Sequence, residues 1–136
     1  MRLPALCHRS PFWFLAFIAW FVVLWFLSSG PLPAPPGPKI PHLDKVLHFG
    51  YFFGGAGLLS AALYLHRRNP PIPWDIIHLI TIVAVTTTGV IDEWHQSWYE
   101  FRSGNDAGDL AADFFGAVAG TLVFRRFRHL VEPKTN

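Results

Sequence analysis

The chain has 136 residues, of which 51% are apolar and 15% charged, and its net charge is +2. Soluble domains carry about 25% charged residues, so this composition favours one membrane domain over a soluble one. The single cysteine, Cys7, excludes an internal disulfide and a CxxC motif. The basic residues are scattered over the ends of apolar runs and form no basic face, so we expect no nucleic-acid partner.

The first apolar run, PFWFLAFIAWFVVLWFLSS, predicts a transmembrane helix at about residues 11–29. About 20 apolar residues in a helix cross the ~30 Å hydrocarbon core of a bilayer, and no charged residue lies between Arg9 and Lys39. A cleaved signal peptide is the competing interpretation, because basic residues precede the run. Signal peptides have a shorter apolar core of about 7–15 residues, so we expect the helix to be retained.

A proline-rich connector is predicted at residues 30–43, where six prolines fix φ and remove backbone donors. The next apolar run predicts a second transmembrane helix at about residues 45–66. A stripe of small residues along it would let another helix approach closely. This stripe consists of Gly50, Gly54 and Gly57.

Two further helices are predicted beyond the segment HRRNPPIP, at about residues 74–96 and 109–128. Pro73 suits the first position of the third helix. In the fourth helix, Gly116 and Gly120 lie one turn apart and form a smooth face for packing. We therefore predict an all-α bundle of four transmembrane helices that forms a single domain over residues 1–136.

The distribution of lysine and arginine predicts the orientation of this bundle. Short loops on the cytoplasmic side carry the excess of these residues. The side of the termini would carry eight of them and the other side three: Arg2, Arg9, Arg67, Arg68, Arg125, Arg126, Arg128 and Lys134, against Lys39, Lys45 and Arg102. We expect both termini in the cytoplasm, the connector and the loop YEFRSGNDAG outside, and a multi-pass protein of the cytoplasmic (inner) membrane.

Most of the acid in the chain falls at the predicted outer ends of the last three helices. Ionisable residues near the bilayer are costly and usually face the bundle interior or a water-filled cavity. Helical spacing puts Asp44 on one face with His48, and Asp109 on one face with Asp113 and the glycine pair. We expect one polar site that borders a cavity open to the outer leaflet. Its candidate ligand-binding residues are Asp44, Lys45, His48, Asp92, Glu93, Gln96, Arg102, Asp109 and Asp113, with His95 at the same level.

Simpler interpretations exist for several of these residues. Asp44 and Asp109 stand where a helix N-cap is expected. Glu100 and Asp106 are expected to face water in the loop. For the acids inside apolar helix, the alternative is an interhelical salt-bridge network with the basic residues of the same face. Outside this site, His78 is expected to be a packed residue rather than a ligand.

Three segments together resemble the VanZ-like family of small bacterial membrane proteins: DKVLHFGYFFGGAGLL, GVIDEWHQ and FRSGNDAGDLAADFFGAVAG. The residues that match the family's pattern are Asp44, Lys45, His48, Phe49, Glu93, Gln96, Arg102, Asp109, Gly116 and Gly120. The chain departs from that pattern at Asp113, where the family often has asparagine. It also has Tyr99, Glu100 and Phe101 where we associate a proline-glycine turn with the family.

The resemblance implies a membrane protein of the bacterial cell envelope. Founding members of the family are associated with resistance to teicoplanin, a lipoglycopeptide antibiotic that acts on the outer side of the membrane. That association is a phenotype and implies no reaction.

Three classes of function remain open from the sequence. The site would recognise the head group of a membrane lipid or a lipid-linked envelope precursor, with Arg102, Lys45 and His48 pairing with phosphate. It would alternatively belong to a metal-dependent enzyme acting on a lipid phosphate, or be a structural feature of a partner of envelope machinery. A transporter with four helices per chain would need to form a homo-oligomer. The residues able to hold a divalent cation are Asp44, His48, Glu93, Asp109 and Asp113.

Overall fold

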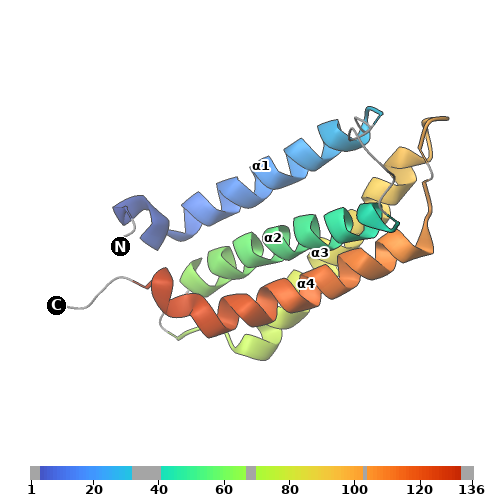
Figure 1. Ribbon diagram of the computed structural model, residues 1–136. Helices are drawn as coiled ribbons and strands as arrows, with labels where there is room; N and C mark the ends of the chain where they lie inside the picture. Colours follow the sequence, from blue (N-terminus) through green and yellow to red (C-terminus); the bar gives the residue numbers. More distant parts are fainter. Residues whose placement is uncertain (1–3, 32–40, 67–69, 103, 133–136) are drawn as a thin grey trace.

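The computed structural model describes residues 4–31, 41–66, 70–102 and 104–132. Four long helices lie alongside one another (Figure 1). They are α1 (Ser10–Ser28), α2 (Leu43–His66), α3 (Trp74–Gln96) and α4 (Ala107–Phe127), with short 3-10 helices η1 (Ala5–His8) and η2 (Arg128–Leu130) at the two ends. No β-strand occurs in the described ranges, so the all-α prediction is confirmed.

Each of the four long helices is long and apolar enough to cross a membrane. Their bounds differ by at most two residues from the predicted spans. Pro73 differs slightly from expectation, because it is the N-cap of α3 and Trp74 is the first helical residue. Of the predicted connector at residues 30–43, positions 32–40 lie outside the described residues.

α4 packs against the backbone of α2, and this contact is the most extensive one between helices. A Cβ on Gly116 would lie 2.5 Å from the carbonyl oxygen of Phe49, and one on Gly120 would overlap the carbonyl oxygen of Phe53. Real Cβ atoms do not approach a carbonyl so closely, so only glycine permits this distance between the helices. The predicted packing role of the glycine pair is confirmed.

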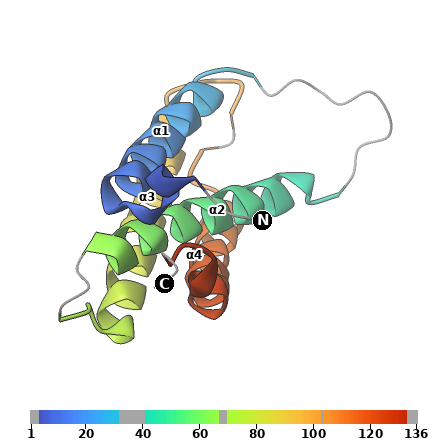
Figure 2. The same cartoon turned by 90° about the vertical axis from the view of Figure 1, so that its left-hand side faces the viewer.

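α1 contacts α2 through a different glycine from those expected. The indole of Trp20 covers Gly55, where a Cβ would lie 2.5 Å from ring carbons. Trp20 Nε1 donates to the carbonyl of Tyr51 at 3.1 Å, and the Tyr51 hydroxyl donates to the carbonyl of Trp20 at 2.8 Å. α2 therefore lies between α1 and α4 (Figure 2).

The expectation for the stripe Gly50, Gly54 and Gly57 was wrong within this chain. A Cβ on any of the three would meet no other described atom within 4 Å. Spacing alone identified a small-residue face of α2, but the neighbouring helices pack against its other sides.

Polar side chains also join the helices within the bundle. Ser60 donates to Thr121 at 2.8 Å and lies 3.2 Å from the Thr81 hydroxyl, which joins α2, α3 and α4. His78 Nδ1 lies 3.0 Å from Thr121 Oγ1, so His78 is a packed residue, as expected.

The two ends of the described chain meet at one end of the bundle (Figure 1). His8 Nδ1 lies 2.8 Å from the carbonyl oxygen of Val131. The polar site described below lies at the opposite end.

A glycine packed against a neighbouring helix and a glycine with open space around it give a matched pair of substitutions for a stability test. Gly120→Ala should lower the free energy of unfolding by about 1–3 kcal/mol, because its Cβ overlaps the backbone of α2. Gly54→Ala should leave it unchanged or raise it by about 0.5–1 kcal/mol, because alanine is the better helix former and the position is open. Thermal unfolding of both variants in detergent measures the difference. Equal destabilisation by the two substitutions would contradict the packing of α4 on α2.

Candidate functional site

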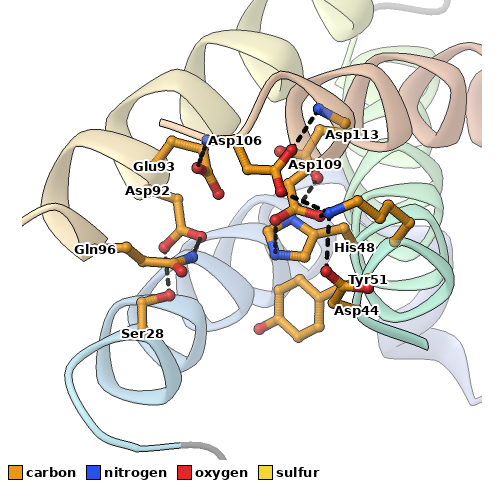
Figure 3. A network of polar contacts seen from close by, with 12 residues as sticks. Ser28, Asp44, His48, Tyr51, Asp92, Glu93, Gln96, Asp106, Asp109 and Asp113 are labelled. Carbon is orange, nitrogen blue, oxygen red and sulfur yellow. Dashed lines mark hydrogen bonds and ion pairs between the residues drawn. The ribbon is translucent and has the colours of Figure 1, made fainter. Parts of the chain in front are cut away.

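Ten polar side chains from all four helices and the loop before α4 gather at the end of the bundle opposite His8 and Val131 (Figure 3). They come from parts of the sequence that only the folded bundle brings together. Figure 3 labels nine of them: Ser28 of α1, Asp44 and His48 of α2, Asp92, Glu93 and Gln96 of α3, and Asp106, Asp109 and Asp113 at the start of α4. The tenth is Lys45 of α2, which binds Asp44, Asp106 and Asp109.

Lys45 is the cation of one half of this site. Its ammonium lies 2.8 Å from Asp44, 2.8 Å from Asp106 and 2.9 Å from Asp109. The hydrogen bond from Lys45 holds the pKa of the Asp106 carboxyl below its usual value. One cation therefore serves three carboxylates on two helices.

The N-cap of α4 is Asp106 and not Asp109, so the capping interpretation of Asp109 was wrong. Asp106 Oδ1 accepts a hydrogen bond from the amide of Gly108 at 2.6 Å. Asp44 lies in the first turn of α2 and is not a cap either. Asp106 was expected to face water, but it binds Lys45; Glu100 is exposed, as expected.

His48 lies between two carboxylates of α4. Its Nδ1 is 2.9 Å from Asp113 Oδ1, and its Nε2 is 4.0 Å from Asp109 Oδ2. Asp113 is fully buried, and a Cβ on Gly89 of α3 would overlap its carboxylate. The absence of a side chain at Gly89 thus makes room for an acid between α3 and α4.

The two acids of α3 are held separately. Asp92 accepts hydrogen bonds from Ser28 of α1 and, at 2.8 Å, from Gln96 one turn later. Glu93 accepts one from the amide of Asp106 at 2.7 Å. Exposed fractions of 3% for Asp92 and 1% for Glu93 show that both carboxylates lie inside the protein.

Arg102 and His95 do not join the carboxylates. Arg102 donates to the carbonyl oxygens of Leu27 at 2.6 Å and Gly30 at 2.9 Å, at the C-terminal end of α1. Within the described residues it forms no ion pair. His95 stacks on Trp25 with ring centroids 3.7 Å apart. Both residues therefore attach α1 to the segment at the end of α3.

A cavity of about 690 Å³ opens between the C-terminal half of α1 and the N-terminal half of α2. Five expected residues line it: Asp44, His48, Gln96, Arg102 and Asp109. Glu93 and Asp113 are not in its wall and lie behind it, where they contact Asp106 and His48. Most of the remaining wall is apolar, including Leu24, Leu27, Val46, Leu47 and Phe52.

The sequence interpretation missed two members of the site. Asp106 stands three residues before Asp109, which is the spacing of a cap followed by an acid in the first helical turn. That pattern could have identified it. Ser28 gave no such signal, because a serine at the end of an apolar run meets Asp92 only through the packing of α1 on α3.

Replacing Lys45 tests how much its ion pairs with the three carboxylates stabilise the fold. Lys45→Met should cost about 1–3 kcal/mol of stability at neutral pH, because Asp109 is buried and loses its only close cation in the described structure. Because the pKa of Asp106 is lower in the folded state than the unfolded value of 3.8, the ionised Asp106 stabilises the fold at pH values above 3.8. This contribution is lost as the pH falls through the pKa of the folded state. The difference in melting temperature between Lys45→Met and the parent protein should therefore shrink towards acid pH.

The control for this test is Glu100→Gln, which removes an exposed charge from the same end of the bundle. It should change the melting temperature little at any pH. A Lys45→Met deficit that persists unchanged in acid would show that packing of the lysine stem, rather than its charge, is responsible.

Comparison of the chain with models of protein families, with curated proteins and with solved structures finds no match. The resemblance to the VanZ-like family therefore stays a prediction.

Proposed function

We propose that this chain crosses the bacterial cytoplasmic membrane four times, with both termini in the cytoplasm. Four apolar helices of spanning length support insertion. The end of the bundle where the chain ends meet carries Arg9, Arg125, Arg126 and Arg128, whereas the other end has Lys45 and Arg102 among the described residues. This excess favours a cytoplasmic position for the termini. The other basic residues of the sequence count are Arg2, Lys39, Arg67, Arg68 and Lys134, which lie outside the described ranges.

The proposed function is binding of a membrane lipid or lipid-linked envelope precursor in the cavity between α1 and α2. The observation that carries this proposal is the division of the cavity wall. Val46 and Leu47 are 64% and 54% exposed and lie on the flank of the bundle. The polar part of the wall includes His48, Gln96 and Asp109. An amphiphile entering from the bilayer would leave its acyl chain on the apolar side and its head group against the polar side.

The charges of the site decide which head groups fit. Arg102 is engaged by carbonyl oxygens of α1, and Lys45 by three carboxylates. Lys45 therefore has no charge left for a phosphate, whereas Arg102, which donates only to neutral carbonyl oxygens, keeps its positive charge in the cavity wall. The polar wall also offers carboxylate oxygens to a cation, an amine or hydroxyl groups.

We also propose that the protein is of VanZ type, and the positions of the motif residues in the fold support this. Asp44 and Lys45 form an ion pair, and Lys45 also binds Asp109. Gln96 and Arg102 belong to the same cavity wall. A head-group site on the outer face fits a protein that alters susceptibility to a lipoglycopeptide such as teicoplanin, since that antibiotic class acts there.

Cysteine labelling tests the orientation. A membrane-impermeant thiol reagent applied to intact cells should label Glu100→Cys in a Cys7→Ser background, because Glu100 is exposed in the loop that follows α3. Native Cys7, near the opposite end of the bundle, should react only after the cells are permeabilised. Labelling of Cys7 in intact cells would overturn the proposed orientation.

Filling the cavity tests lipid binding. Gly50 lines the cavity and has open space around its Cβ position, so Gly50→Leu should occupy the cavity without disturbing the fold. Native mass spectrometry of the detergent-purified protein should show at least about a tenfold loss of retained phospholipid. The same variant, expressed in a susceptible bacterium, should fail to alter teicoplanin susceptibility.

Gly54→Leu is the matched control, because it adds the same side chain one turn away, in open space outside the cavity lining. It should retain lipid and phenotype like the parent. Equal lipid retention by Gly50→Leu and Gly54→Leu would refute binding in this cavity.

A further inference from the structure

Three side chains beside and behind the cavity wall carry donor atoms close enough to share one ion; of the three, only His48 lines the cavity itself. His48 of α2 and Asp92 and Glu93 of α3 each offer one ligand atom, and these atoms lie within 4.8 Å of one another. Figure 3 shows the Glu93 and Asp92 carboxylates pointing into the space beside the His48 ring. We propose that His48, Asp92 and Glu93 form a binding site for a divalent metal ion.

Glu93 gives the independent reason to expect an ion. One carboxylate oxygen accepts a hydrogen bond from the amide of Asp106, whereas Oε1 is buried and has no hydrogen-bond partner among the described residues. Buried polar atoms in native proteins are nearly always satisfied, and exceptions mark an ion, a water or a functional group. The unpartnered oxygen belongs to a side chain that is 1% exposed and points towards the other two donors.

The environment of His48 matches that of a metal-binding histidine. His48 Nδ1 lies 2.9 Å from Asp113 Oδ1. With Asp113 ionised, Nδ1 would donate this hydrogen bond, because a carboxylate only accepts. An uncharged ring in that tautomer would present the lone pair of Nε2 to an ion. Asp109 lies 4.0 Å from Nε2, too far for a hydrogen bond. Metal-bound histidines usually carry such a carboxylate on the other ring nitrogen, which fixes the tautomer and raises the basicity of the ligand. Asp113 is therefore a positioning residue.

Asp92 is oriented by neighbours that also line the cavity. Ser28 and Gln96 each donate to one of its oxygens, and both belong to the cavity wall. Carboxylate oxygens keep further lone pairs after accepting one hydrogen bond. With three protein ligands, the ion would keep open coordination positions, and the cavity beside His48 leaves room for them.

A second group of acids shows what a filled cation position looks like in this protein. Asp44, Asp106 and Asp109 also bring ligand atoms within 4.8 Å of one another, but the ammonium of Lys45 lies among them at 2.8–2.9 Å. No lysine or arginine within the described ranges forms an ion pair with Asp92 or Glu93. A divalent ion would balance the charges of these two carboxylates. One nitrogen and two oxygen donors suit Mn²⁺, Zn²⁺ or Fe²⁺.

The metal site extends the proposed function. The identity of the molecule that would bind to the ion, a lipid head group, rests on that proposed function. Lys45 is held by three carboxylates, so the ion would add to the charge of Arg102 the positive charge that a phosphate or hydroxyl head group needs at this end of the cavity. Ion binding is measured without added lipid, so the metal-site proposal and the lipid-binding proposal can be refuted independently of each other. Loss of lipid from Gly50→Leu with intact ion binding would separate the two.

Binding of Mn²⁺ to the chelator-treated protein in detergent, without added phospholipid, tests the site. Isothermal titration should show one ion per chain, and electron spin-echo spectra should show coupling of the ion to a histidine nitrogen. Glu93→Gln and Asp92→Asn should each raise the dissociation constant about a hundredfold or more, because each removes a ligand charge. The control Glu100→Gln removes an exposed acid from the same end and should change it less than about threefold.

Asp113→Asn keeps the test decisive if a ligand variant fails to fold. It leaves all three ligands in place, so it should raise the dissociation constant about 10–100-fold and weaken the nitrogen coupling. A merely structural role for Asp113 would lower the melting temperature and leave that coupling unchanged. The proposal is overturned if the folded parent protein binds no Mn²⁺, or if binding survives Glu93→Gln and is lost in Asp44→Asn.

Discussion

Gly116 and Gly120 bring α4 against the backbone of α2, and the register of this contact decides which charged groups meet. The two helices run in the same direction, so the turns before Gly116 lie beside the turns before Phe49. Asp109 therefore meets Lys45 and Asp113 meets His48. A shift by one turn would separate these pairs and leave the buried carboxylates of Asp109 and Asp113 without them, which costs about 1–3 kcal/mol for each unsatisfied group. Backbone contact and charge pairing thus favour the same register.

The carboxylates of the resulting site fall into two groups, and the negative charge of each group is compensated differently. Around Lys45, three carboxylates share one ammonium at hydrogen-bond distance, so that half already holds a cation. Around Glu93, burial is nearly complete and hydrogen bonds come only from neutral donors in the described part of the chain. Burial of an unbalanced carboxylate favours either protonation or a bound cation. Placing His48 beside Asp92 and Glu93 makes the second half suitable for a metal ion.

The sequence predicted the four helices well because apolar length and proline breaks are local properties. It also placed Asp113 towards a neighbouring helix, since the carboxylate repeats with the glycine pair at helical spacing. It could not give the rotation of each helix about its axis. Gln96 lies within about one turn of both acids of α3, and only the packed structure shows that its hydrogen bond goes to Asp92. The small-residue stripe of α2 was misassigned for the same reason, because only packing shows that Trp20 selects Gly55.

The position of α1 depends on groups that first resembled ligands. Arg102 binds the last carbonyls of α1, and Ser28 of α1 binds Asp92. Both attachments lie at the polar end of the cavity, while Trp20 fixes the middle of the helix against α2. Ser28 and Arg102 also line the cavity, so the contacts that hold the end of α1 shape its wall. Arg102 makes its contacts through two of its N–H groups and keeps its positive charge in that wall.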